Sequence, residues 1–156
     1  MNKPYSLLVY LIFAIVILSG CGAKDDKDVI NHNYIYSGEN EFWTGEYEMD
    51  ATEIFEKRDG VLTYENKSSG LLTVTYKGAF SELTEVKQVD ISYKSSKNSG
   101  RLVNDYSKES PVSSNEFKIR TGGENSALSD ENDVIYVEIN IDGVTESLEL
   151  KTDPGL

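Results

Sequence analysis

The sequence predicts an all-β protein, an immunoglobulin-like antiparallel β-sandwich of about seven or eight strands. From Tyr34 onward, apolar and polar residues alternate with a period of two rather than 3.6, which is typical of strands with one buried and one exposed face. These segments are short and are separated by turn-forming residues, which favours two packed antiparallel sheets. A small β-barrel is the alternative.

Residues 1–20 are predicted to be a signal peptide. Lys3 precedes an uncharged apolar run, residues 5–18, which is shorter than the roughly 20 residues needed to cross a bilayer. The four residues around the end of this run resemble the lipobox of bacterial lipoproteins: Leu18, Ser19, Gly20 and Cys21. The resemblance implies cleavage after Gly20 and attachment of a diacylglyceryl group to the Cys21 thiol. Two or more acyl chains hold a protein durably to a membrane.

After the signal peptide we expect a tether and one domain. The 156 residues less the 20 of the signal peptide leave 136, which suits a single domain. Residues 21–32 are polar and charged, as in a flexible tether, and end at His32, which we expect to face solvent. Residues 33–152 form the predicted β-sandwich domain.

The first half of the domain contains several predicted strands. The alternation is clearest in residues 43–49, 72–76 and 89–93. Asp59-Gly60 predicts a reversal between a strand that ends near Phe55 or Glu56 and a strand over residues 61–64. Residues 66–70 are rich in turn formers and are predicted to be a turn before the next strand.

The β pattern is interrupted in the middle of the chain. Phe80, Leu83 and Val86 recur every three residues, which predicts a short helical turn over residues 81–87. Residues 94–115 and 121–133 are rich in Ser, Gly, Asn and charge and are predicted to be the longest loops, with a weak strand over 116–120 between them.

The clearest prediction is a C-terminal hairpin. Strand-like residues 134–141 and 144–150 flank Asp142-Gly143, which favours a two-residue type I′ turn. Such a turn pairs the strands in one register: Ile141 with Val144, Val137 with Leu148 and Ile135 with Leu150. All of these residues are apolar, so the turn and the hydrophobic pattern agree.

Composition excludes several function classes. The net charge is −12, and removal of the signal peptide with its single Lys makes it −13, so we expect the surface to repel nucleic acid and anionic lipid headgroups. Cys21 is the only cysteine and His32 the only histidine, so the sequence lacks the residues for a disulfide or a usual zinc site. A Ser-His-Asp or Cys-His site would have to be built on His32, and acylation of Cys21 would leave no free thiol for it. No Gly-x-Ser-x-Gly motif is present. We therefore predict no catalytic residue and no cofactor.

Calcium needs only oxygen ligands and is not excluded by these counts. Asp130, Asn132 and Asp133 place oxygen-bearing side chains in one short loop and are the candidate cation ligands. Their spacing does not fit an EF-hand, and a solvated acidic loop is the alternative interpretation. A carboxylate-dependent hydrolase of the cell envelope also stays open, because the many acids allow a carboxylate pair without indicating one.

Tyr136 is the candidate for contact with a partner. Most tyrosines, such as Tyr47, Tyr76 and Tyr93, lie on the apolar phase of their strands and are predicted to be core residues. Tyr136 instead lies on the polar phase with Glu138, and the hairpin register sets Glu149 opposite it. An exposed aromatic ring can anchor a protein partner or stack on a sugar.

The chain also resembles a known group of proteins. The residues that carry the resemblance are the lipobox, Asn33-Tyr34, Gly38-Glu39, Trp43, the segment Thr75-Tyr76-Lys77-Gly78 and Leu83. Together with the closing hairpin they are similar to small uncharacterised lipoproteins of Bacillus-type Gram-positive bacteria. The resemblance implies a domain displayed on the outer face of the cytoplasmic membrane. We therefore expect an anchored extracytoplasmic binding module whose partner is a protein, a peptide or an envelope polymer.

Overall fold

A computed structural model describes residues 26–107 and 111–152 of the chain, which form eight strands and one 3-10 turn. The elements are β1 (Asp26–Glu39), β2 (Trp43–Arg58), β3 (Val61–Tyr76), η1 (Phe80–Leu83), β4 (Gln88–Lys94), β5 (Ser99–Asp105), β6 (Glu116–Glu124), β7 (Ile135–Ile141) and β8 (Val144–Thr152). The predicted signal peptide and its lipobox, Leu18 to Cys21, lie outside the described residues.

The chain divides into two compact units. The smaller unit contains the tip of the β2–β3 hairpin, residues 55–64. Among the described residues it also contains 26–28, at the start of β1. The other contains residues 29–54 and the described residues from 65 onward. The hydrophobic core belongs to this larger unit.

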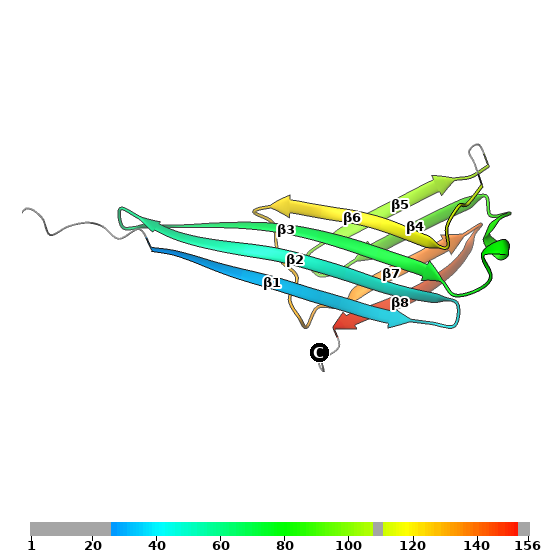
Figure 1. The fold of residues 1–156 in the computed structure, drawn as a ribbon, viewed down its shortest axis with the longest axis horizontal. Helices are drawn as coiled ribbons and strands as arrows, with labels where there is room; N and C mark the ends of the chain where they lie inside the picture. Colours follow the sequence, from blue (N-terminus) through cyan, green and yellow to red (C-terminus); the bar gives the residue numbers. More distant parts are fainter. Residues whose placement is uncertain (1–25, 108–110, 153–156) are drawn as a thin grey trace, which may run out of the picture. The chain divides into compact units, whose positions relative to one another are not determined.

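All eight strands belong to one antiparallel sheet, with the order β5-β4-β7-β8-β1-β2-β3-β6 (Figure 1). In the larger unit the sheet folds over on itself at the junction of β8 and β1, where Tyr36 pairs with Thr152 and Ser37 with Lys151. The two edge strands, β5 and β6, contact each other, so the fold is nearly closed. The predicted all-β class and strand number are confirmed, and the arrangement lies between a sandwich and a small barrel.

The predicted C-terminal hairpin is confirmed in its register. Ile141 pairs with Val144, and Val137 with Leu148, as the turn requires. Asp142 and Gly143 have φ angles of 48° and 90°, the positive values of a type I′ turn.

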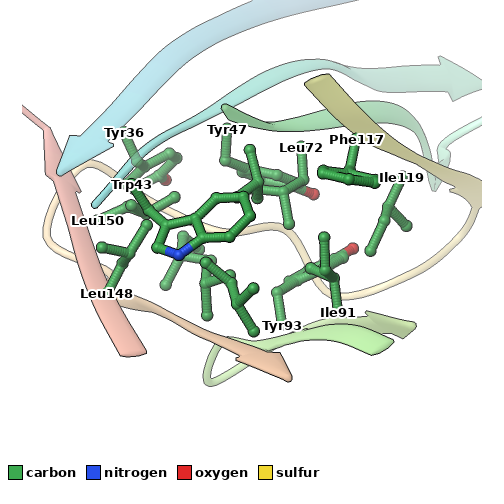
Figure 2. Close-up of a cluster of buried hydrophobic side chains, with 14 of the residues drawn as sticks. Tyr36, Trp43, Tyr47, Leu72, Ile91, Tyr93, Phe117, Ile119, Leu148 and Leu150 are labelled. Carbon is green, nitrogen blue, oxygen red and sulfur yellow. The ribbon is translucent and has the colours of Figure 1, made fainter. Parts of the chain in front are cut away.

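The core fills the space between the two halves of the folded sheet (Figure 2). Tyr47 and Tyr93 are 2% exposed, which confirms that they are core residues, whereas Tyr76 is only partly buried and packs against the core. The hydroxyl groups of Tyr47 and Tyr93 both lie near the hydroxyl of Thr121, at 3.4 Å and 3.1 Å. Burial raises the pKa of Tyr93 well above its usual range. The buried tyrosines therefore pack as apolar rings and still find polar partners.

The predicted turn at residues 66–70 is wrong, because β3 runs through it without a break. The Asn66 side chain makes two hydrogen bonds to the backbone of Ser126. Its Nδ2 donates to the Ser126 carbonyl at 2.9 Å, and its Oδ1 accepts from the Ser126 amide at 3.0 Å. A Cβ added to Gly70 would lie 2.3 Å from the Tyr47 hydroxyl oxygen. These turn-forming residues thus serve side-chain pairing and core packing inside a strand.

The predicted loop over residues 94–115 also contains a strand, β5. This strand lies at an edge of the sheet, and its inward residues are half-buried, so its sequence lacks a strong apolar alternation. A Cβ on Gly100 would lie 2.5 Å from the Tyr93 ring, which explains a glycine within the strand. The helical turn predicted over 81–87 is a 3-10 turn, Phe80–Leu83, whose Leu83 is buried.

Part of the predicted tether is also strand. Residues 26–32 are extended, because β1 begins at Asp26. In the order of strands in the sheet, β1 is next to β2. His32 does not face solvent as a linker residue would: its Nε2 lies 2.7 Å from Glu53 Oε1 and its Nδ1 3.2 Å from the Tyr34 hydroxyl. Its side chain is 25% exposed, so the contact with Glu53 is partly shielded from water.

Candidate binding surface around Tyr136

Tyr136 lies on the outer face of the half-sheet formed by β5, β4, β7 and β8. It is 56% exposed, as its place on the polar phase of β7 predicts. Lys94 of β4 pairs with it on one side and Glu149 of β8 on the other. The ring therefore has a cationic residue and an anionic residue as its neighbours across the strands.

A shallow groove of about 380 Å³ lies beside this ring. The next row of the sheet brings Ser92, Glu138 and Ser147 side by side, and these residues line the groove with Tyr136. The two serine side chains are small, so they leave a depression between the larger side chains around them. We call this groove and its rim, which includes Lys94 and Glu149, the Tyr136 surface.

Two ion pairs lie on the same face of the half-sheet as Tyr136. Lys151 Nζ lies 2.9 Å from Glu149 Oε2, and this hydrogen bond raises the pKa of Lys151. Further along the same face, Arg101 binds Asp90 through Nε at 2.8 Å and through a second nitrogen. The hydrogen bonds from Arg101 lower the pKa of Asp90. The surface thus combines an exposed ring with charges of both signs, a composition that suits protein and peptide partners.

The three candidate cation ligands do lie in one turn. Asp130 Oδ1 accepts a hydrogen bond from the Asn132 amide at 2.9 Å, and Asp133 Oδ2 accepts one from the Asp130 amide at 3.4 Å. Asp133 Oδ1 also accepts from the Ser96 hydroxyl at 2.6 Å. These oxygens therefore stabilise the turn itself, and calcium binding stays a prediction.

The same turn is attached to the body of the larger unit. The Tyr36 hydroxyl donates to the Asp130 carbonyl at 2.7 Å, and the Thr152 hydroxyl donates to the Glu131 carbonyl at 2.6 Å. Burial and the nearby carboxylates raise the pKa of Tyr36. In residues 26–107 and 111–152 no group of three or more His, Cys, Asp or Glu side chains is placed to hold a metal ion.

The sequence predicts only part of the Tyr136 surface. The turn register alone places Glu149 opposite Tyr136, because the two strands are consecutive. Lys94 and Ser92 come from β4, which is distant in sequence, and no local signal shows that β4 pairs with β7. A match of the apolar phases of these two strands is the only sequence feature that could have suggested it.

Comparisons with known protein families, with curated proteins and with solved structures found no match. Within the part of the chain that the structure describes, no helix is long and apolar enough to span a bilayer.

Proposed function

We propose that the protein is a membrane-anchored extracytoplasmic binding module that holds a protein, a peptide or an envelope polymer on the Tyr136 surface. The observation that carries this proposal is the exposed ring of Tyr136 beside a groove on the sheet. Tyrosine supplies a large contact area at a low cost in side-chain entropy, and it is enriched among residues that dominate binding energy.

The position of the ring on a central strand favours binding further. Tyr136 belongs to β7, which is paired on both sides, with β4 and with β8. Its backbone is therefore held in place before a partner arrives, so little ordering is needed on binding. The net charge of −12 supports a partner other than nucleic acid.

A photo-crosslinker tests the Tyr136 surface directly. We expect p-benzoylphenylalanine in place of Tyr136 to form a discrete adduct with one partner in intact cells. The same crosslinker in place of Val103 is expected to form none. Val103 is also exposed on this half-sheet, at 51%, but it lies outside the groove. Equal adducts at both positions, or none at either, would contradict the proposal.

Once the partner is identified by that adduct, substitutions measure the contribution of the ring. We expect Tyr136→Ala to weaken the affinity about 30-fold, the effect of losing a binding residue worth about 2 kcal/mol, and Tyr136→Phe to weaken it far less. Titration calorimetry with the purified partner provides the measurement. Equal affinities of the alanine variant and the parent protein would show that the ring is not part of the interface.

The anchor has its own test. We expect Cys21→Ala to abolish incorporation of labelled lipid and to release the protein into the medium, because the thiol is the atom that the lipobox resemblance assigns to acylation. Ser19→Ala keeps a small residue before the cysteine and is expected to retain both properties. Unchanged membrane retention of the Cys21→Ala protein would refute the lipid anchor.

A further inference from the structure

The tip of the β2–β3 hairpin exposes large apolar side chains. Val61 is 63% exposed, Leu62 67% and Tyr64 46%. All three lie in residues 55–64, within the smaller compact unit and outside the core of the larger one. The core therefore does not explain why these positions are apolar.

The tip is an ordered hairpin with two distinct faces. Asp59 and Gly60 have φ angles of 51° and 82°, so a two-residue turn sets Phe55 opposite Tyr64. Their rings lie 5.0 Å apart, and the Thr63 hydroxyl donates to the Glu56 carbonyl at 3.1 Å. Strand alternation then places four side chains on one face, which we call the tip face: Phe55, Lys57, Leu62 and Tyr64.

The charge of the tip differs from that of the chain. Glu56, Lys57, Arg58 and Asp59 sum to zero, whereas the whole chain carries −12. Arg58 is paired with Glu56 at 2.7 Å, and Lys57 is exposed. A neutral apolar tip is not repelled by an anionic leaflet, and a lysine beside aromatic rings is typical of residues that lie at a membrane interface.

The tip is also close to the predicted anchor along the chain. Residues 26–28, at the start of β1, belong to the same compact unit as residues 55–64 (Figure 1). Asp26 follows Cys21 by five residues, which span at most about 17 Å when fully extended. A lipid on Cys21 therefore holds this unit within a short distance of the bilayer surface.

We propose that the tip face inserts into the headgroup region of the membrane to which the protein is anchored. The inference rests on the lipid anchor proposed above. Tyr64 and Phe55 then lie at the interface, Leu62 reaches the acyl boundary and Lys57 contacts lipid phosphates. The anchor supplies a high effective concentration, so a contact that is weak in a free protein forms readily when the protein is tethered.

The cysteine content of the chain permits a direct test with the full lipoprotein. Cys21 is the only cysteine and is acylated under this proposal, so Leu62→Cys introduces one reactive thiol for the dye NBD. The labelled lipoprotein is reconstituted into phosphatidylglycerol–phosphatidylethanolamine vesicles that carry doxyl-lipid quenchers. Val144→Cys is the matched control, because Val144 is 66% exposed and also follows an Asp-Gly turn.

We expect the emission from position 62 to shift to the blue and to be quenched by doxyl lipid at least threefold more than the emission from position 144. Equal quenching at both positions, or a water-exposed signal at 62, would overturn the insertion of the tip. Self-quenching that rises with protein density without lipid quenching would assign the tip to contact with a second copy, and would also overturn it.

A mass measurement on the same preparation separates this inference from the proposed anchor. A diacylglyceryl group on Cys21 together with an unquenched position 62 overturns the tip contact and leaves the anchor intact. A Cys21 without lipid refutes the anchor and, with it, the tip inference that depends on it.

Discussion

Replacing Leu150 by alanine is expected to lower the free energy of unfolding by about 2 to 5 kcal/mol, the range for a fully buried leucine. Leu150 is 0% exposed and fills the space that two glycines leave open. A Cβ on Gly45 would lie 2.8 Å from Leu150 Cδ2, and a Cβ on Gly38 3.1 Å from the same atom. Because strand pairing holds the backbone around it, the site cannot collapse fully, and a cavity remains.

Urea unfolding followed by the fluorescence of Trp43, the only tryptophan, measures this change. Val144→Ala, at an exposed position of the same strand, is the control and is expected to change stability by less than about 0.5 kcal/mol. Gly45→Ala should be less costly in the Leu150→Ala protein than in the parent, since its methyl group then enters the cavity. Additive effects of the two substitutions would contradict this packing.

Gly38→Ala is expected to destabilise the fold by about 3 kcal/mol, at the upper end of the costs of overpacking. The added Cβ would lie 2.2 Å from the backbone carbonyl oxygen of Glu149, which is not a flexible atom. Gly38 directly follows Ser37, which is registered with Lys151 of β8. The clash therefore opens the junction at which the sheet folds over.

Hydrogen exchange combined with urea unfolding tests this expectation. Gly123→Ala is a matched control, because its Cβ would meet the Ser126 side chain at ordinary distances, the hydroxyl oxygen at 3.6 Å and the Cβ at 3.9 Å. We expect Gly38→Ala, and not Gly123→Ala, to speed exchange of the amides of residues 36–38 and 150–152. The same stability for both alanine variants would show that the junction has room for a side chain.

The C-terminal hairpin could be predicted in detail because two local signals coincide. The Asp-Gly turn fixes the register of the two strands, and in that register the apolar residues of both strands lie opposite each other. The prediction of Tyr136 as a surface residue follows from the same register. Lys94, its neighbour on the other side, depends on the pairing of β4 with β7, which no turn specifies.

The predictions of a turn over residues 66–70 and of a tether up to residue 32 were wrong because these residues contact partners that are distant in the sequence. Asn66 and Gly70 are common in turns, but here one pairs with Ser126 and the other makes room for the Tyr47 hydroxyl. The first residues of β1 are charged like a linker, yet they extend the sheet. The amino-acid composition of a segment indicates only its local conformational preference. In these segments the tertiary contacts determine the conformation instead.

The pairing of β1 with β8 constrains when this fold can form. Tyr36 and Thr152 are neighbours in the sheet although 116 positions separate them in the chain. In the export proposed above, which starts at the N-terminus, β8 leaves the translocation channel after β1, although β1 needs β8 as its neighbour in the sheet. Folding dominated by such distant pairings is slow. Under that proposal the emerging chain would stay unfolded, and open to chaperones and proteases, until β8 has also left the channel.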